Sequence, residues 1–197
     1  TVTPRGPSSV AITLATLSIA PFAAAWAAKP APGERDSYGR LRTYSDIVGA
    51  EVYRSDDQGE SWRKMSPSNQ MFERFGGTYG WVFSQIRVDP NDENTVYIMG
   101  LGLAKSTDGG KSFTRMGLET TQTIGRIRPH PTDPNIVYVA ASGHPWGYTG
   151  DRGLFKTTDG GATWTKLTQG LPNDGKTGAI DLVMDSTNPD VLYVSFW

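Results

Sequence analysis

Three aspartates recur inside one short motif, and a carboxylate held at a fixed position could serve acid catalysis or stabilise a turn. The motif reads [Ser/Thr]-x-Asp-x-Gly-x-[Ser/Thr]-aromatic, and its copies start 51 residues apart both times. Its defining residues are Ser55, Asp57, Gly59 and Trp62, then Ser106, Asp108, Gly110 and Phe113, then Thr157, Asp159, Gly161 and Trp164. Three matches at constant spacing make a strong repeat signal.

Each copy of the motif lies between two strand-like runs, such as Leu103–Lys105 and Phe113–Met116, and we interpret it as a hairpin turn. In such a turn the Asp carboxylate can accept backbone N–H bonds and the Gly permits a positive φ. The aromatic ring is expected to tuck under the hairpin and bury apolar surface. We therefore predict a structural role, not a catalytic one, for the three aspartates.

Charged residues outside the motif offer a second kind of chemistry. Arginines on the predicted inner strands could line a channel and bind an anion: Arg87, Arg126 and Arg128. Strand alternation puts Arg126 and Arg128 on one face, and solvation or pairing with carboxylates is the alternative to anion binding. A carboxylate pair for glycoside hydrolysis could come from Asp151, Asp174 and Asp181, but no spacing selects a pair. We expect no catalytic residues and therefore no enzyme.

Aromatic and apolar residues gather in two insertions. The third repeat carries ten extra residues within Ser142–Gly153, and these hold three binding candidates, His144, Trp146 and Tyr148. Aromatic side chains on a loop held by a rigid sheet are typical of binding surfaces, although such a loop can also pack on itself. The segment Ser66–Gly80 holds four further candidates for docking onto a partner or a neighbouring blade: Met71, Phe72, Phe75 and Tyr79.

The composition removes several classes of function. Because cysteine is absent, disulfides, thiolate metal sites and cysteine nucleophiles are excluded. Only two histidines occur, His130 and His144, which makes a multi-histidine metal site unexpected. A net charge of −1, from 19 Lys+Arg against 20 Asp+Glu, provides no long-range field for nucleic acid. We expect no metal, no cofactor and no nucleic-acid partner.

Turns rich in Pro and Asn, such as His130–Asn135, join the other two strands of each repeat. Twelve strands follow from this pattern, and they predict an all-β propeller arc of about three four-stranded blades. Propellers usually have four to eight blades. The arc is therefore expected to be closed by itself, by a second copy or by another subunit, or to be a piece of a longer propeller. Edge strand Val191–Trp197 or Glu51–Arg54 is expected to be paired, or capped by a neighbouring chain.

Residues 6–28 carry no charge and form an apolar leader, for which a helix is one conformation. Two interpretations stay open, a secretory signal peptide and a retained segment that anchors the chain to a membrane through residues 8–28. Polar, aperiodic residues 29–49 are interpreted as a linker. The expected organisation is a leader (1–28), a linker (29–49) and a repeat domain (50–197), located on the periplasmic or extracytoplasmic face and associated with a membrane.

The repeats resemble those of Asp-box (bacterial neuraminidase repeat) β-propellers. Segments such as Ile124–Gly147 and Arg152–Trp164 look most like the bacterial sortilin-type, Vps10-like, repeat proteins. The same repeat class includes sialidases, xyloglucanases, sortilin ectodomains and the photosystem II assembly propeller, so the resemblance implies the fold far better than the function. The sequence departs from these families in its short length and in lacking the cysteines of animal sortilins.

From these features we expect a non-catalytic, extracytoplasmic propeller scaffold. Its partners would be protein subunits of a membrane complex, photosynthetic complexes included, and it would act as a subunit or as an assembly or stabilising factor. The alternative is a glycan-binding or glycoside-hydrolase-like propeller fragment, in which a sugar stacks on Trp146 or Tyr148.

Overall fold

The computed structural model describes residues 11–15, 35, 38–39, 51–66, 85–100, 102–144, 147–148 and 151–197, with the backbone alone for residues 11–15 and Glu51. Every regular element in these ranges is a β-strand, and all the pairings are antiparallel. Within the same ranges no helix is long and apolar enough to cross a membrane. The all-β prediction is confirmed.

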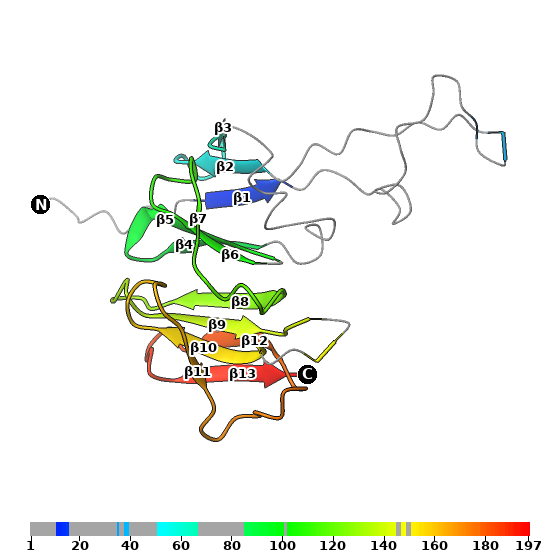
Figure 1. Ribbon diagram of the computed structural model, residues 1–197. Helices are drawn as coiled ribbons and strands as arrows, with labels where there is room; N and C mark the ends of the chain where they lie inside the picture. The colour runs from blue at the N-terminus through cyan, green and yellow to red at the C-terminus, as the bar shows by residue number, and fades with distance from the viewer. Residues whose placement is uncertain are drawn as a thin grey trace, which may run out of the picture.

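Two complete four-stranded sheets form the middle of the molecule (Figure 1). The second sheet along the chain contains β4 (Gln85–Asp89), β5 (Asp92–Met99), β6 (Leu103–Ser106) and β7 (Thr114–Arg115). The third contains β8 (Ile124–Pro129), β9 (Val137–Ala141), β10 (Gly153–Thr157) and β11 (Thr165–Leu167). In both sheets each strand pairs with the next one in the chain, so each sheet is a meander of the kind that makes a propeller blade.

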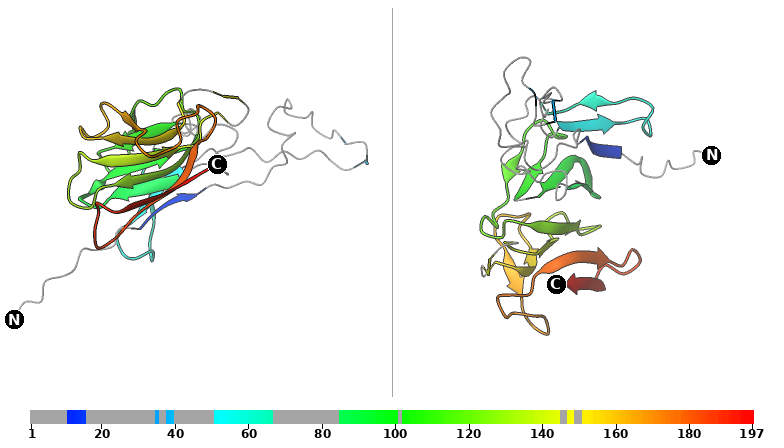
Figure 2. Two further views of the ribbon diagram at one scale, coloured as in Figure 1. Left: turned by 90° about the horizontal axis from the view of Figure 1, so that it is seen from below. Right: turned by 90° about the vertical axis from the view of Figure 1, so that its right-hand side faces the viewer.

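Shorter sheets flank these two on opposite sides. The first sheet has the order β1 (Ala11–Ala15), β2 (Glu51–Ser55) and β3 (Arg63–Lys64), and the last pairs β12 (Ala179–Met184) with β13 (Leu192–Phe196). The right-hand view of Figure 2 shows all four sheets stacked as an arc, with β2 at one extremity and β13 at the other. Strands β2 to β13 are the twelve that the sequence predicts over residues 50–197.

Five residues of the apolar leader form β1, where the sequence left room for a helix. They pair with β2 in continuous register from Ala11 opposite Ser55 to Ala15 opposite Glu51. The free edge of β2 presents unpaired N–H and C=O groups, and an added strand satisfies them. The predicted pairing of the Glu51–Arg54 edge is therefore made by the chain's own leader. Among the described residues, β13 pairs with β12 alone.

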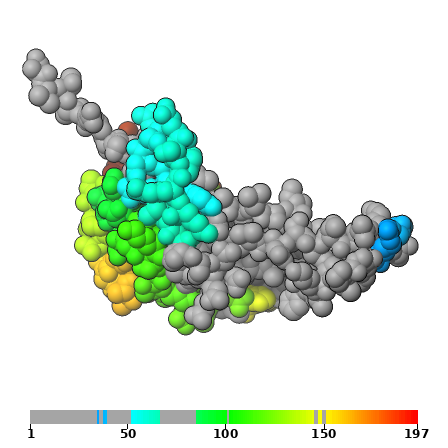
Figure 3. Space-filling view, turned by 90° about the horizontal axis from the view of Figure 1, so that it is seen from above, coloured from blue at the N-terminus to red at the C-terminus, as the bar shows by residue number. Residues whose placement is uncertain are grey.

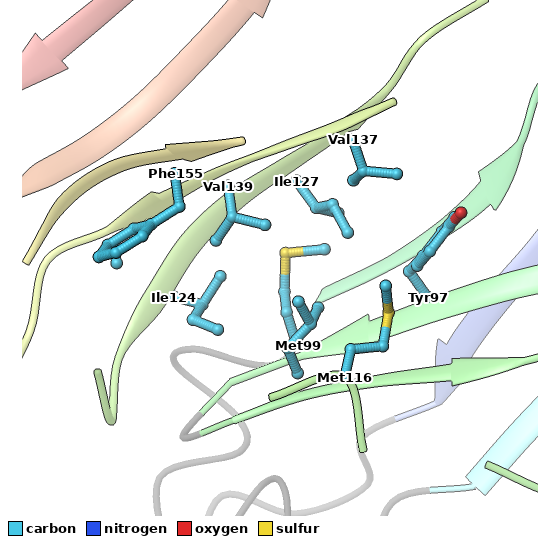
Figure 4. Close-up of a cluster of buried hydrophobic side chains, with 10 residues drawn as sticks. Tyr97, Met99, Met116, Ile124, Ile127, Val137, Val139 and Phe155 are labelled. Carbon is cyan, nitrogen blue, oxygen red and sulfur yellow. The ribbon is translucent and has the colours of Figure 1, made fainter. Parts of the chain in front are cut away.

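Hydrophobic clusters fill the spaces between neighbouring sheets. The largest joins the second and third sheets and includes Tyr97, Met99, Ile124 and Val139, which Figure 4 shows converging from β5, β8 and β9. A smaller cluster around Val52 joins the first and second sheets, and seen from that side residues 51–66 lie over the second sheet (Figure 3). Because each sheet buries its faces on its neighbours, the stack of sheets is itself the core.

The alternation of strand directions gives the stack two different ends. All three Asp-box turns lie at one end, at the left in Figure 1, which we call the box end. Loops 116–123, 142–152 and 168–178 lie at the other, the loop end. The strand ends that flank the second aromatic insertion, Lys64 and Gln85, are also at the loop end.

The carboxylate of each Asp box is bonded by groups of its own turn. In the second box, Asp108 accepts hydrogen bonds from Ser106 Oγ (2.7 Å), Ser112 N (2.9 Å) and Ser112 Oγ (2.5 Å), and Lys111 N donates at 2.9 Å. The corresponding hydroxyl and amide bonds recur around Asp57 and Asp159. These bonds are those of a turn, as the sequence predicts.

The box glycines and aromatics connect each blade to the one before it. Gly110 and Gly161 have φ values of 94° and 99°, which favour glycine. A Cβ on Gly110 would lie 3.0 Å from Val52 Cγ1, and one on Gly161 would meet the end of the Met116 side chain, so a side chain at either position would displace a residue of the preceding blade.

The expected tucking of the aromatic under its own hairpin is replaced by packing on the preceding blade. The Trp164 indole donates to Met116 O at 2.6 Å, and Phe113 packs against the Val52 cluster. Trp62, in the first box, is 43% exposed. No described sheet precedes it, and its indole instead donates to Gly59 O in its own turn.

We predict that Asp108→Asn lowers the free energy of unfolding by about 1–2 kcal/mol, because an amide oxygen accepts the serine and backbone bonds without a charge. Thermal or urea unfolding monitored by tryptophan fluorescence measures the difference. The exchange Asp190→Asn, at an exposed position outside the boxes, is the matched control and should stay within about 0.5 kcal/mol of wild type. Equal effects at the two positions would refute the structural role of the box carboxylate.

The box also predicts how stability depends on pH. Burial raises the pKa of Asp108, but hydrogen bonds from Ser112, Ser106 and Lys111 N outweigh it and hold the pKa at about 2, below the ordinary 3.8. A carboxyl whose pKa is lower in the folded state stabilises the fold above its unfolded pKa, and this contribution disappears as the pH falls towards about 2. We therefore expect the melting temperature of wild type to drop more steeply between pH 4 and 2 than that of Asp108→Asn. Parallel curves for the two proteins would contradict this.

Candidate functional site

The inner strands β4, β8 and β12 come from three consecutive sheets and lie next to one another. Gln85 Nε2 of β4 donates to Gly125 O of β8 at 3.0 Å. On the other side of β8, a Cβ on Gly125 would collide with the carbonyl of Ile180 in β12, so glycine lets the two backbones approach. This close approach brings charged side chains of three blades together on one surface, formed by β4, β8 and β12, which we call the inner wall.

Arg126 at the centre of this wall is paired. Its Nε donates to Asp181 Oδ1 at 2.5 Å, and its Nη1 donates to Gln85 Oε1 at 3.1 Å. Both Arg126 and Asp181 are partly exposed. The guanidinium of Arg126 lowers the pKa of Asp181 below its ordinary range, so this carboxylate is held ionised. Arg126 is therefore paired with a carboxylate, which is one of the alternatives that the sequence left open.

Arg87 and Arg128 complete a group that we call the inner arginine cluster (Arg87, Arg126 and Arg128). Arg87 donates to Ile86 O at 2.7 Å and to Gln85 Oε1 at 3.2 Å, and Arg128 donates to Ile127 O at 3.4 Å. No carboxylate of the described residues pairs with either. Partial burial and the positive charge of Arg126 lower the pKa of both guanidinium groups. In the described part of the chain, three guanidinium groups therefore share one carboxylate, and the remaining positive charge is available to an oxyanion.

Two of the three carboxylates considered for glycoside hydrolysis, Asp174 and Asp181, are engaged elsewhere. Asp174 accepts bonds from Thr177 N, Thr177 Oγ1 and Lys176 N within its own loop, and these hold its pKa at about 2. Asp181 is paired with Arg126. A general acid needs a raised pKa, so neither side chain is prepared for that role in this arrangement.

The insertion at the loop end is organised by Arg152, which is 7% exposed. Its guanidinium donates to three backbone carbonyls, those of Lys176 (2.6 Å), His144 (3.0 Å) and Gly147 (2.5 Å). These bonds join the insertion 142–152 to the loop 168–178. Arg152 therefore sets the shape of the surface that both loops present.

Among the described residues of this surface, Tyr148 is an exposed aromatic side chain, at 78%. The Arg152 guanidinium carbon lies 6.0 Å and the Lys176 ammonium 5.8 Å from the centroid of its ring. Cations at these distances are attracted to an aromatic face and restrain the ring without covering it. The predicted binding candidate His144 contributes its carbonyl to the Arg152 bonds. The loop therefore packs on itself through Arg152 and still leaves the ring of Tyr148 accessible.

Five of the predicted binding residues lie outside the described residues: Trp146, Met71, Phe72, Phe75 and Tyr79. Three residues that organise the site were not singled out for these roles from the sequence. Arg152 and Lys176 are single cations in polar loops, and no periodicity marks them. Gln85 is a polar residue at the start of a predicted inner strand, and its position on that strand was the available signal.

The repeat pattern and the sheets agree with a known family. Residues 50–178 match the family described as Sortilin, neurotensin receptor 3 (Sortilin-Vps10). The chain belongs to the Sortilin-Vps10 family. No similar sequence was found among curated proteins.

The chain is also similar to solved structures of propeller enzymes. It matches an ancestral GH74 enzyme with 23% identity and a TM-score of 0.52, over 76% of this chain and 19% of that chain. It matches the GH74 enzyme of Niastella koreensis with 20% identity and a TM-score of 0.49, over 77% of this chain and 24% of that chain. The chain spans a quarter or less of these structures, and at such identities the likeness concerns the fold alone.

We predict that Arg152→Ala loosens both loops at the loop end, because three carbonyls lose their donor. Amide hydrogen exchange should become faster in residues 142–148 and 174–178 and stay unchanged in β4–β7. The control is Arg115→Ala, whose exposed side chain forms an ion pair with Glu119 at 3.8 Å, away from both loops. Unchanged exchange in both loops of Arg152→Ala would show that other contacts shape this surface.

Proposed function

We propose that the chain is a non-catalytic binding domain that holds acidic groups of a protein partner on the inner arginine cluster. The observation that carries the proposal is the surplus of positive charge in this cluster, where one carboxylate, Asp181, faces three guanidinium groups. Clustered like charges repel one another in the free protein. A bound carboxylate adds attraction to each guanidinium group and so offsets this repulsion.

The bonding of Arg87 and Arg128 supports a ligand role over a structural one. Both donate to a carbonyl of their own strand, and Arg87 also reaches Gln85, two residues away. Such contacts add little to the joining of separate sheets. Arg126, in contrast, bridges β4, β8 and β12 through Gln85 and Asp181. We therefore assign the ligand contact to Arg87 and Arg128, with Arg126 as the group that fixes the wall.

The proposed absence of catalysis is supported by the state of two carboxylates, Asp174 at the loop end and Asp181 on the inner wall. Hydrogen bonds hold Asp174 ionised, and the Arg126 ion pair does the same for Asp181. We also propose that the domain works at the extracytoplasmic face of a membrane, as part of a protein complex. Within the uncharged stretch of residues 6–28, residues 11–15 belong to β1 of the repeat domain. The support for this location is therefore the uncharged remainder, residues 16–28, and fractionation of the native cells tests it.

We predict that the double variant Arg87→Gln/Arg128→Gln weakens binding of a Glu-rich peptide at least tenfold, because two charge-assisted bonds are lost. The same peptide with Gln in place of Glu should bind neither protein, and binding to wild type should fall as salt rises. The melting temperature should stay the same or rise, since repulsion is relieved.

The control for this experiment is Arg63→Gln/Arg115→Gln, which removes two cations from the outer strands β3 and β7. It changes the net charge equally and should leave peptide binding within about twofold of wild type. Equal losses in the two double variants would point to a general charge effect and reject the inner wall as the site.

A second function, glycan binding, is favoured by the 78% exposure of Tyr148. A ring restrained by Arg152 and Lys176 offers a flat surface on which a sugar can stack. A glycan array read with wild type and Tyr148→Ala decides the matter. Spots bound by wild type and lost in the variant would support this function, and a blank array would dismiss it.

A further inference from the structure

The side-chain amide of Gln85 holds two arginines of the inner wall at one oxygen atom. Its Oε1 accepts hydrogen bonds from Arg87 Nη2 at 3.2 Å and from Arg126 Nη1 at 3.1 Å, and its Nε2 donates to Gly125 O at 3.0 Å. Since a carbonyl oxygen only accepts and a guanidinium group only donates, these three bonds allow one orientation of the amide. Gln85 therefore joins guanidinium groups of two blades without adding a charge.

The charges of the inner wall are unequal in number among the described residues. Arg126 forms an ion pair with Asp181 at 2.5 Å. Arg87 and Arg128 bond to neutral acceptors, which are backbone carbonyls and Gln85 Oε1. Burial, followed by the positive charges of Arg126 and Arg128, lowers the pKa of Arg87, so the three groups act on one another. Three guanidinium groups and one carboxylate leave two positive charges without a counter-charge.

Most N–H donors of Arg87 and Arg128 form no hydrogen bond within the described residues. A guanidinium group has five N–H donors in one plane. Arg87 uses two of them, on Ile86 O and Gln85 Oε1, and Arg128 uses one, on Ile127 O. Both arginines are partly exposed, so a ligand can reach them from the solvent. Their partial burial strengthens an ion pair relative to one on an open surface.

Charge and oxygen count distinguish the anionic groups that a protein partner can present. One carboxylate has two oxygens and one negative charge, so it leaves one arginine of the wall without a counter-charge. A phosphate monoester carries close to two negative charges at neutral pH and has three strong acceptor oxygens. One phosphate can therefore match the charges of Arg87 and Arg128 together and accept bonds from both. A sulfate ester has the same tetrahedral shape but a single charge.

We propose that the inner arginine cluster selects a phosphate monoester of a protein partner over a carboxylate, and that Gln85 sets this selectivity. The inference rests on the proposed function, because it names the acidic group that the wall holds. Arg87 and Arg128 contact the phosphate oxygens, while Arg126 stays with Asp181. Residue 85 has to be neutral, because a carboxylate there would bond to the same guanidinium groups and compensate the charge that the phosphate requires.

The first test compares three peptides of one sequence, which carry phosphotyrosine, sulfotyrosine or glutamate at the same position. Calorimetric titration of the full-length chain at pH 7.5 should show at least tenfold tighter binding of the phosphotyrosine peptide than of the other two, because phosphate brings the second charge. Equal affinities for phosphotyrosine and sulfotyrosine, which share one shape, would reject selection by charge. Inorganic phosphate should compete at least tenfold more weakly than the phosphotyrosine peptide, and equal competition would assign the site to free phosphate instead.

The outcomes of this comparison separate the inference from the proposed function. If the glutamate peptide binds as tightly as the phosphotyrosine peptide, and the variant Arg87→Gln/Arg128→Gln weakens both, phosphate selectivity is rejected and the binding of acidic groups stands. If the wild-type chain binds none of the three peptides, and the Glu-rich peptide does not bind either, both proposals fail.

The second test uses the ionisation of the ligand. The second proton of a phosphate monoester titrates near pH 6, whereas a glutamate side chain stays ionised down to about pH 4.3. Arginines remain protonated over this range, and Asp181, whose pKa is lowered by Arg126, remains ionised. Lowering the pH from 7.5 to 5.5 should therefore weaken phosphotyrosine binding about fourfold relative to glutamate and sulfotyrosine binding. Equal pH dependence for the three peptides would reject the need for a second charge.

The third test changes Gln85. Gln85→Glu keeps the length of the side chain, adds a negative charge beside Arg87 and Arg126, and should weaken phosphotyrosine binding at least tenfold while reducing the preference over glutamate to about threefold or less. Gln85→Met keeps the size and loses the bonds, so it should weaken both peptides alike and leave the preference unchanged. Gln169→Glu, which adds the same charge at an exposed position in the loop 168–178, should stay within about twofold of wild type.

Melting curves should show that these three variants are folded. A folded Gln85→Glu variant with the full phosphate preference of wild type would refute the role of Gln85. A Gln85→Met variant that loses the preference as completely as Gln85→Glu would show that side-chain position, and not charge, sets the selectivity.

Discussion

The bonding of one carboxylate in each repeat governs the rest of this structure. Asp108 and its counterparts Asp57 and Asp159 accept hydrogen bonds from serine or threonine hydroxyls and from backbone amides of their own turns. Because the turn satisfies the charge internally, it needs no outside partner and keeps one shape in every blade. That shape directs a glycine with positive φ at the preceding sheet, and the absence of a side chain there lets neighbouring blades come into contact. The interblade clusters that form the core rest on this contact.

The same stacking explains why positive charges gather on the inner wall. Packing the sheets brings β4, β8 and β12 together, and Gly125 lets β8 and β12 approach more closely than other residues would. Arg126 meets Asp181 across this junction, whereas Arg87 and Arg128 meet only carbonyls and Gln85. A wall that served stability alone would match its charges, and this mismatch is the basis of the ligand role proposed for Arg87 and Arg128. The folded state tolerates it because the guanidinium groups are only partly buried.

The box end and the loop end of the stack have different structural roles. The box end repeats the same turns with little variation, since those turns hold the blades together. The loop end varies between repeats, and Arg152 holds its largest described insertion through carbonyl groups. Bonds to carbonyls depend on backbone position and leave the side chains of the loop free to differ. Sequence variation can therefore accumulate at the loop end without disturbing the stack, as is usual for propeller surfaces that bind ligands.

The sequence by itself determined the repeats, the strands and the turns. The motif around Asp57, Asp108 and Asp159 and the alternating runs beside it depend on local hydrogen bonding and periodicity, which neighbouring residues specify. All twelve strands predicted over residues 50–197 are present, and membership of the Sortilin-Vps10 family agrees with the resemblance of the repeats. Strand alternation also predicts that Arg126 and Arg128 lie on one face of their strand.

Only the tertiary structure decided which residues meet across blades. The pairing of Arg126 with Asp181 joins side chains 55 residues apart, and no local pattern couples them. The three carbonyls that hold Arg152 come from two loops, and Trp164 packs on the cluster between the second and third sheets and donates to Met116 O of the preceding blade. For Ala11–Ala15, an uncharged sequence is compatible with either a helix or a strand. The unpaired edge of β2, a property of the folded sheet, decided for the strand.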